Sequence, residues 1–363
     1  MEKKWKKTLV SSLLVVCFVF CMGLTIDGMI TSAQARDYIV IQNWGGALNK
    51  AQIIAFLKPF TEETGIKVIS VEAGTSIGGK LAAMQKSGNI EWDIISGEQD
   101  SYLKIFASKG YLEEIDYNIV NNTQYLVDGS ARKYGVAQQI EGMCLVYNKK
   151  FFPEGKGLKS YKDFFDVKKF PGPRAMHNWG GPYDSLAIAL MADGLSPDEC
   201  FPIDFDRAFK MMDKVKPHIK VWYTSGAQLV HALQDEEAVI AISTDGRAKQ
   251  AISSGVPLEI VWNRSFYILT YYAVVKGTPM KDEAMKLLQF CNRPEQQAIY
   301  TNHMGYTGTN KKSIQYLHPM FQKQQITHPD NTSAFNLMAL KNAQWVVDNV
   351  KEVDERWNSW IVR

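Results

Sequence analysis

Two overlapping motifs near the start of the chain contain residue types that could perform covalent or phosphate chemistry. Residues 74–78 (GTSIG) satisfy the G-x-S-x-G pattern in which a hydrolase exposes a serine, here Ser76, between a strand and a helix. The same stretch reads G-x-x-x-x-G-K, but Leu81 stands where a phosphate-binding loop needs a hydroxyl group for magnesium. A secreted hydrolase using Ser76 remains an alternative, although no later histidine lies in a recognisable setting for it.

Helix starts suggest a second kind of chemistry, the noncovalent binding of a small solute. Thr75 and Ser76 precede an expected helix, and Ser225 precedes another at 227–234. Unpaired N–H groups and hydroxyls at a helix start can hold an anionic or carbonyl group. Ordinary capping of the two helices is the alternative for these residues.

A repeated tetrapeptide connects two distant parts of the chain. The sequence Asn-Trp-Gly-Gly occurs at 43–46 and again at 178–181, each time after a short strand and before a helix. Loops at the carboxyl ends of parallel strands face the ligand crevice, and paired glycines let the backbone approach a solute closely. We therefore expect Trp44 and Trp179 to line a cleft from opposite walls; two buried packing tryptophans are the alternative.

Strand-like runs alternate with helical patterns in two series. The first has expected strands at 38–42, 67–72 and 92–96, with helices at 51–64 and from 79 to 86. The second has expected strands at 174–177, 220–223 and 238–243, with helices at 183–192, 227–234 and after Gly246. This rhythm is typical of parallel α/β sheets and predicts two similar α/β lobes.

Two long apolar stretches are suited to connect these lobes. Residues 134–147 and 258–275 are expected to cross from one lobe to the other, with helices at 282–290, 294–301 and 335–360 after the second crossing. We assign 1–35 to a signal peptide, 36–140 with 274–363 to the first lobe, and 141–273 to the second. Hinged lobes around a cleft close on a ligand.

The first 35 residues have the three parts of an export signal. A basic start is followed by an apolar run at 9–26 and by Ala33-Gln34-Ala35, which suits cleavage before Arg36. An uncleaved membrane anchor is the alternative. Cleavage would leave a nearly neutral chain of 37 basic and 36 acidic residues, which gives no electrostatic footprint for nucleic acid.

Cysteines and histidines give little support to metal chemistry. Cys144, Cys200 and Cys291 are sparse and lack C-x-x-C spacing, so we expect buried thiols, of which at most one pair could form a disulfide. The six histidines show no H-x-x-H spacing. We expect neither a metal nor a cofactor.

The order of several segments resembles a known family over nearly the whole chain. The chain is similar to periplasmic solute-binding proteins of ABC importers, in the branch that includes spermidine- and putrescine-binding proteins. The similar stretches are 43–46, 60–68, 92–95, 142–148, 222–228, 245–247, 255–257, 261–262, 284–290 and 293–294. The resemblance implies a type II periplasmic binding protein fold, an α/β fold of two lobes joined by a hinge around a ligand cleft. It also implies a non-enzymatic periplasmic protein that delivers solute to an inner-membrane permease, and we expect a monomer; a receptor subunit for a membrane sensor is a further alternative.

Several acidic and aromatic positions that polyamine binders of this family use for the ligand differ in this chain. Polyamine binders of this family surround the alkyl chain with aromatic residues and place carboxylates at the ammonium ends. The resemblance implies an acid after Val261-Trp262, yet residues 261–276 contain no Asp or Glu and offer Tyr271 among other tyrosines. The resemblance also implies that Asp184 fills another family acid position and that Asp245 belongs to the ligand site, where Thr244 replaces the family aromatic residue.

Charged residues leave two ligand classes open. Arg247 follows an expected strand end, where a guanidinium can hold a carboxylate through two hydrogen bonds; an exposed helix start is the alternative. Glu98, Asp100 and Glu141 could still hold an amine. The ligand is therefore expected to be either an amino-acid-like, carboxylate-bearing solute or a polyamine.

Overall fold

The computed structural model describes residues 36–73, 77–153, 155–178, 182–323, 325 and 342–363. Nearly all of them belong to one compact unit, Asp37–Arg363. The expected signal peptide and the candidate residues Thr75, Ser76 and Trp179 lie outside the described residues. No helix among the described residues is long and apolar enough to cross a membrane.

The first series of elements forms one end of the sheet, as the alternating pattern predicts. Its strands are β1 (Tyr38–Asn43), β2 (Lys67–Glu72) and β3 (Ile94–Gln99), and β1 pairs in parallel with both of the others. Its helices are α2 (Gly46–Gln52), the π-helix η1 (Ile53–Leu57), α3 (Lys58–Thr64), α4 (Ile77–Ser87) and α5 (Asp100–Ser108). Gly65 ends α3 in the left-handed conformation that glycine adopts without steric cost.

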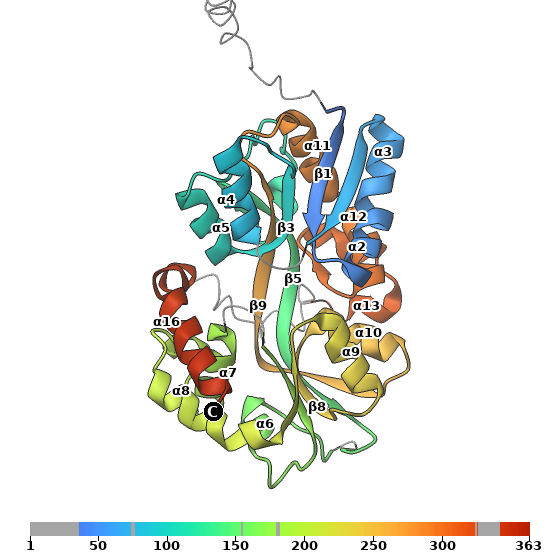
Figure 1. Cartoon of the computed structure of the whole chain (residues 1–363). Coiled ribbons are helices and arrows are strands. Elements are labelled where there is room, and N and C mark those ends of the chain that lie inside the picture. The colour runs from blue at the N-terminus through green and yellow to red at the C-terminus, as the bar shows by residue number, and fades with distance from the viewer. Residues whose placement is uncertain (1–35, 74–76, 154, 179–181, 324, 326–341) are drawn as a thin grey trace, which may run out of the picture. The chain divides into compact units, whose positions relative to one another are not determined.

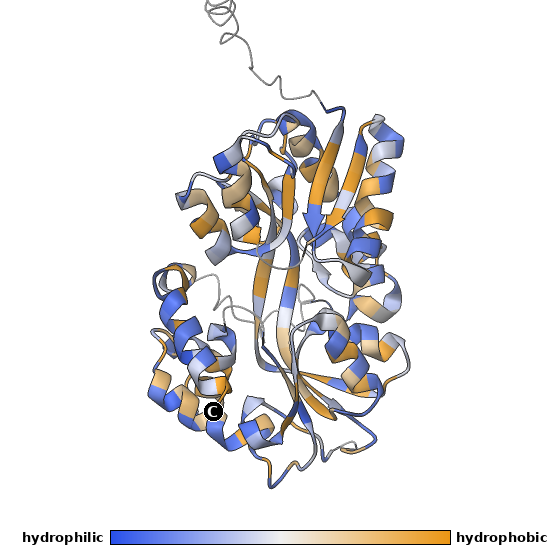
Figure 2. Ribbon diagram, in the orientation of Figure 1, coloured by the Kyte–Doolittle hydropathy of each residue, from blue (hydrophilic) through white to orange (hydrophobic). Residues whose placement is uncertain are grey.

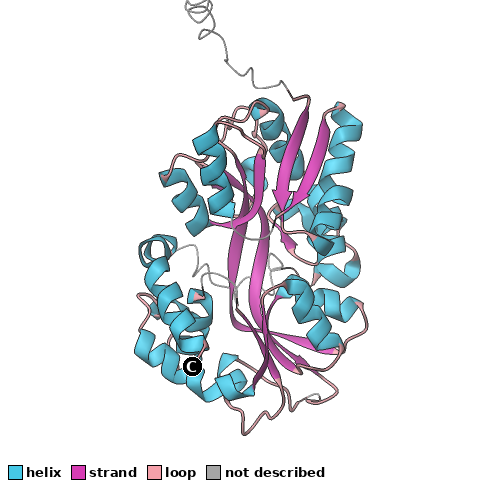
Figure 3. Cartoon of the chain, in the orientation of Figure 1, coloured by secondary structure: helices cyan, strands magenta, loops and turns pink. Residues whose placement is uncertain are grey.

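The second series forms the other end of the same sheet (Figures 1 and 3). Its strands are β6 (Arg174–His177), β7 (Ile219–Tyr223) and β8 (Ile240–Thr244), and β6 pairs in parallel with both neighbours. Its helices are α6 (Tyr161–Phe165), α7 (Tyr183–Ala192), α8 (Phe205–Val215), α9 (Gly226–Gln234) and α10 (Asp245–Ser253). The expected strands and helices of this series are confirmed, and α6 and α8 are additions.

Two long strands join the two ends into a mixed sheet. The order is β2-β1-β3-β9-β5-β8-β6-β7, in which β9 (Leu258–Val274) is antiparallel to β3 and to β5 (Gly135–Asn148), and β5 is antiparallel to β8. Pairing within each series is parallel, as expected, and the centre adds antiparallel pairing because β5 and β9 cross the molecule in opposite directions. Residues 94–99 of β3 pair with the end of β9, whereas β8 pairs with residues 143–147 of β5. Each long strand thus serves both series, and the precise residue at which one lobe ends remains a prediction.

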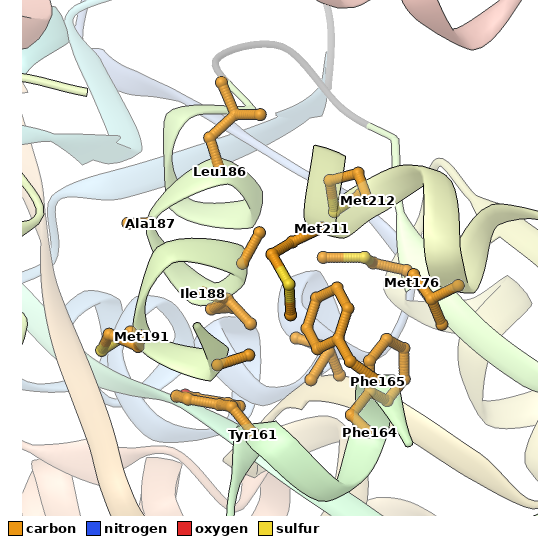
Figure 4. Close-up of a cluster of buried hydrophobic side chains, with 14 of the residues drawn as sticks. Tyr161, Phe164, Phe165, Met176, Leu186, Ala187, Ile188, Met191, Met211 and Met212 are labelled. Atoms are coloured by element: carbon orange, nitrogen blue, oxygen red, sulfur yellow. The ribbon is translucent and has the colours of Figure 1, made fainter. Parts of the chain in front are cut away.

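Apolar residues are concentrated along the strands of the sheet, while the helices alternate between apolar and polar residues (Figure 2). In the second series, α7 is buried along its whole length. Met176, Leu186 and Met212 lie in one cluster with the aromatic rings of Phe164 and Phe165 (Figure 4). Close packing of this kind fixes β6 and α7, which carry candidate site residues. The three described cysteines are buried thiols, as expected.

The C-terminal elements divide between the two series. After β9 come α11 (Lys281–Cys291), α12 (Pro294–Met304), β10 (Thr307–Gly308), which pairs with β5, and α13 (Pro319–Gln322). The last helix, α16 (Ala343–Ile361), instead places Trp357 and Trp360 in the core of the second series. This corrects its assignment to the first lobe: its buried residues recur at helical spacing, and the aromatic partners that cover them belong to β7 and α8.

Short elements complete the described fold. The two-residue strand β4 (Ala131–Arg132) pairs with the beginning of β5. Single 3-10 turns are η2 (Thr123–Tyr125), η3 (Pro197–Glu199), η4 (Lys216–His218) and η5 (Lys311–Tyr316).

Candidate functional site

Trp44 follows β1 in a turn that depends on glycine. Gly45 and Gly46 have φ angles of 74° and 60°, in the region that favours glycine. Trp44 Nε1 donates to the carbonyl oxygen of Ser96 at 3.0 Å, while 46% of the side chain remains exposed. The sequence thus forms the expected turn at a strand end and leaves a large aromatic surface available.

A β-bulge in β3 lies beside this tryptophan. The register with β9 shifts between Ser96 and Glu98, and Gly97 has a φ of 84°. A Cβ atom on Gly97 would lie 2.5 Å from Trp44 Nε1, so glycine is needed for the indole to approach. Bulges reorient side chains next to functional sites. This one is followed by Glu98, which is 4% exposed.

Glu98 is a buried carboxyl group with an unsatisfied oxygen. Its Oε1 has no hydrogen-bond partner. Burial raises the pKa of Glu98 to about 8, because desolvation penalises the charged form. Such a group accommodates a proton or a cation at low energetic cost.

Asp100 and Tyr271 take part in contacts within the protein. Asp100 Oδ1 lies 3.2 Å from Arg132 Nε, and Asp100 Oδ2 lies 3.6 Å from Lys104 Nζ. Tyr271 is fully buried, and its hydroxyl donates to the carbonyl oxygen of Gly129 at 2.8 Å. The structure therefore gives these two candidates structural partners.

Arg247 lies against the start of α9. A Cβ atom built on Gly226, the first residue of α9, would come within 2.0 Å of Arg247 Nε. Ser225 caps that helix, since its Oγ accepts a hydrogen bond from the backbone N–H of Gln228 at 3.3 Å. Arg247 Nη1 donates to Gln250 Oε1 at 3.0 Å, and no described carboxylate lies within salt-bridge distance of the guanidinium. The unpaired guanidinium and the positive end of the helix both favour an anion at this position.

Asp245 is occupied by a buried ion pair. Its Oδ2 accepts from Lys249 Nζ at 2.7 Å, and its Oδ1 accepts from the backbone N–H of Gly142 at 2.9 Å. Lys249 Nζ also donates to the carbonyl oxygen of Gly305 at 2.9 Å. Oδ1 thus joins α10 to β5, while Oδ2 is held within α10, so both carboxylate oxygens of Asp245 already have partners in the protein.

Asp184 forms a buried cluster with His177 and Ser185. His177 Nε2 lies 2.8 Å from Asp184 Oδ1 and 2.9 Å from Ser185 Oγ. The three side chains are at most 2% exposed. A serine nucleophile and an orienting acid must contact different nitrogens of the imidazole. Because both contact Nε2 here, the cluster is not arranged as a catalytic triad.

Glu141 lies near Arg247 where β5 passes between the two series. Its Oε1 accepts from Gln139 Nε2 at 2.6 Å. Burial raises the pKa of Glu141 to about 7, with Gln139 and the positive charge of Arg247 opposing the shift. Tyr300 and Tyr306 experience the charges of both Glu141 and Arg247. An acid with a raised pKa, a guanidinium and two phenols therefore interact electrostatically with one another.

A second group of contacts joins β3 and α5 to α7. The Tyr183 hydroxyl donates to Gln99 Oε1. The negative charges of Glu98 and Asp184 add to the dominant effect of burial in raising the pKa of Tyr102 to about 12. Sequence patterns gave no signal for this contact, because Tyr183 and Gln99 belong to different series.

The structure thus distributes the predicted residues over several strand ends. Trp44 and Glu98 lie at the ends of β1 and β3, and Ser225 and Arg247 lie together at α9 and α10. Glu141 was expected only as an amine partner, and no sequence pattern indicated Tyr300 or Tyr306. An isolated acid between apolar residues of a long strand, at 141, was the signal that could have been weighted more.

Comparison with known proteins defines the class to which this arrangement belongs. The family model described as "Bacterial extracellular solute-binding protein" matches residues 55–328. The chain belongs to this family. It has the two-lobed α/β fold of periplasmic binding proteins, whose members bind solutes for ABC transporters and are not enzymes.

Individual relatives cover nearly the whole chain. A γ-aminobutyric acid-binding protein of Pseudomonas aeruginosa is 31% identical over 336 residues, which is 91% of this chain and 92% of the relative. The structure of an ABC transporter substrate-binding protein from Bradyrhizobium japonicum superposes with a TM-score of 0.80, at 30% identity and over 90% of this chain and 99% of the other. A binding protein of Agrobacterium tumefaciens in complex with agropinic acid gives a TM-score of 0.76, at 31% identity and over 90% and 98% of the two chains.

Proposed function

We propose that the protein captures a small solute carrying both a carboxylate and an amine, of the γ-aminobutyric acid type, and delivers it to the membrane permease of an ABC importer. Arg247 holds the carboxylate and Glu141 faces the amine. Trp44 covers the solute from the end of β1, opposite the residues of the second series.

The unpaired guanidinium of Arg247 at the start of α9 carries this proposal. A hydrogen bond to a charged group contributes about 1.5–3 kcal/mol, and a helix N-terminus adds about 0.3–1 kcal/mol for an anion. Both effects act at Arg247, because its Nε lies where Gly226 begins the helix. A polyamine ammonium at this position would instead meet like charge.

Glu141 supports the amine end of the same solute. Its Oε1 is engaged by Gln139, and no described donor is bonded to the other carboxylate oxygen. Arg247 is close enough to influence its ionisation. A zwitterion brings its own pair of charges, so the carboxylate of Glu141 and the guanidinium of Arg247 each gain a partner.

Two relatives are described with acids as ligands, which supports the carboxylate of the proposed solute. The Pseudomonas aeruginosa relative is described as binding γ-aminobutyric acid, and the Agrobacterium tumefaciens protein holds agropinic acid. At 21% identity, a spermidine/putrescine-binding periplasmic protein of Escherichia coli is more distant.

We further propose export to the periplasm with cleavage before Arg36, action as a monomer, and no role in nucleic-acid binding. The basic start, apolar run and Ala33-Gln34-Ala35 support cleavage. Intact-mass analysis of the periplasmic fraction tests it: a species retaining residues 1–35 would contradict the proposal.

Calorimetry with wild-type protein and the variant Arg247→Met tests the ligand. The expected result is binding of γ-aminobutyric acid by the wild type and at least tenfold weaker binding by Arg247→Met, with an unchanged circular dichroism spectrum. Spermidine and putrescine are titrated alongside. Tight polyamine binding that survives Arg247→Met would overturn the proposal.

A polyamine is the second candidate, because Glu98 favours it. The Glu98 carboxyl group is buried, and one of its oxygens has no hydrogen-bond partner. The negative charges of Glu98 and Asp184 both contribute to raising the pKa of Tyr102, so both acids act on the same phenol. An ammonium group at Glu98 would supply the missing partner. Glu98→Gln therefore weakens polyamine binding if this candidate holds, and leaves the binding of γ-aminobutyric acid close to the wild-type value if the first proposal holds.

A further inference from the structure

The two copies of the repeated tetrapeptide begin with asparagines whose side chains are used differently. Asn43 Nδ2 donates to Asn49 Oδ1 at 3.0 Å and to Ser70 Oγ, and its Oδ1 accepts from the backbone N–H of Gly45 at 2.8 Å. All of the polar atoms of this side chain are engaged in the local turn. Asn43 is therefore a structural residue with no donor left for a solute.

Asn178, at the end of β6, is held differently. Its backbone N–H donates to the carbonyl oxygen of Tyr223 at 2.8 Å, and its Oδ1 accepts from Trp357 Nε1 at 2.8 Å. No described group accepts a hydrogen bond from its Nδ2, and the residue is half-buried. Because an indole can only donate, the bond to Trp357 determines which end of the amide is the oxygen, and it turns the NH2 group away from the indole.

Trp357 is itself rigidly held in α16. It is 2% exposed and contacts Trp222 with a ring-centroid distance of 5.9 Å and Trp360 with one of 5.1 Å. On the other side, α16 runs beside α5, where the charge of Asp354 acts on Tyr102. The indole therefore reaches Asn178 from a helix that is fixed by both series.

Asn178 lies at the carboxyl ends of the parallel strands that carry the second half of the candidate site. Its partner Tyr223 ends β7, and the phenol of Tyr223 experiences the charges of both Asp184 and Arg247. Ligands of open α/β sheets bind at this end of the strands. An amide NH2 group presented there is a donor for an acceptor such as a carboxylate.

We propose that Asn178 binds the carboxylate of the solute through its side-chain NH2 group, and that Trp357 is the positioning residue that fixes this amide. The inference rests on the proposed function, because it assigns a second donor to the same carboxylate that Arg247 holds. It makes the C-terminal helix, α16, part of the solute site.

Three variants separate positioning from stability. Trp357→Phe keeps an aromatic ring but removes the donor. Asn178→Asp keeps an acceptor for Trp357 but replaces the NH2 group with an anionic oxygen. Trp360→Phe is the matched control: it removes the bond from Trp360 Nε1 to Asp213 Oδ1, of 2.7 Å, on the same helix.

Calorimetry with γ-aminobutyric acid and thermal unfolding are measured for each variant. We expect about fivefold weaker binding for Trp357→Phe, at least tenfold weaker binding for Asn178→Asp, and a change of less than twofold for Trp360→Phe. The double variant Trp357→Phe/Asn178→Asp should bind no more weakly than Asn178→Asp. Wild-type affinity in Asn178→Asp, or equal losses in Trp357→Phe and Trp360→Phe, would overturn the inference while leaving the proposed function intact.

A measurement without ligand tests separately whether Trp357 is bonded to Asn178 and positions its amide. In nitrogen-15 NMR spectra, Asn178→Ala should remove the solvent protection of the Trp357 indole N–H and leave that of Trp360 unchanged. Unchanged protection of Trp357 would overturn the positioning role. A wild-type protein that binds neither γ-aminobutyric acid nor any other carboxylate would overturn the proposed function, and with it the ligand contact of Asn178.

Discussion

A Cβ atom on Gly226 would lie 2.0 Å from Arg247 Nε, so the guanidinium occupies the space that any larger residue would need at the start of α9. Gly226 is helical, and its φ angle is not in the left-handed region. The glycine is therefore required by the arginine rather than by the backbone. A substitution at Gly226 should therefore change the affinity for a ligand without lowering the stability of the protein.

Gly226→Ala should weaken binding without destabilising the fold. Alanine stabilises a helix interior by roughly 0.5–1 kcal/mol relative to glycine, and less at a first turn. The new methyl group displaces the guanidinium, so calorimetry should show at least fivefold weaker binding of γ-aminobutyric acid at an unchanged or slightly higher melting temperature. Gly79→Ala is the control, because Gly79 lies in α4 and its Cβ would meet no atom within 4 Å. Equal affinities for the two variants would contradict the role of Arg247.

Glu98 should make the stability of the protein fall as the pH rises. Its folded pKa, about 8, is higher than the ordinary value of 4.5, so the native state binds more protons than the unfolded state between these values. Stability is therefore lost as the pH increases through this window. Glu98→Gln removes the titration, and its stability relative to wild type should grow by on the order of 2 kcal/mol between pH 5.5 and pH 8. Urea unfolding at several pH values measures this; a constant difference would show that Glu98 does not titrate there.

The sequence predicted the local elements well, because their signals are local. The β2 prediction at 67–72 and the α7 prediction at 183–192 coincide with the observed bounds. β1 continues one residue beyond the predicted end, to Asn43. Apolar alternation, helical spacing and the glycines after each strand were sufficient for these elements.

Long-range pairing could not be predicted in the same way. The antiparallel pairing of β5 with β9 joins residues more than 100 positions apart, such as Gly142 and Tyr267. Nor did α16 show which series it covers, because an apolar stripe does not identify its partner. For the same reason, the sequence indicated Arg247 as an anion ligand but not its contact with Gly226, and Asp245 as a ligand residue but not its ion pair with Lys249.

Trp44 should report solute binding by fluorescence. Almost half of its side chain is exposed, while the indole is fixed by Ser96. Closure of a solute onto the ring would shift its emission to shorter wavelength, and Trp44→Phe should remove most of that shift and weaken binding about threefold. Trp345→Phe serves as the control, because Trp345 contacts Phe201 through an edge-to-face arrangement in the second series. A full spectral shift in Trp44→Phe would show that this tryptophan does not line the site.

Glu141 should release a proton when the solute binds near neutral pH. Its pKa is about 7, so roughly half of the molecules carry the proton at pH 7. An ammonium group beside the carboxylate favours the ionised form and lowers this pKa, because opposite charges attract in a site shielded from water. Binding therefore displaces up to about 0.5 proton at pH 7, and affinity should rise as the pH increases towards 8.

Calorimetry at pH 7 in phosphate and in Tris detects this release, because the two buffers differ in their enthalpy of protonation. The apparent enthalpy of binding should differ between the buffers for the wild type and for Glu98→Gln, but not for Glu141→Gln, which should also bind at least fivefold more weakly. Loss of the buffer dependence in Glu98→Gln instead would move the amine partner from Glu141 to Glu98. That result would favour the polyamine candidate, because the amine would then lie beside Glu98 at the end of β3. Trp44 is close to this position, since its indole donates a hydrogen bond to Ser96, two residues before Glu98.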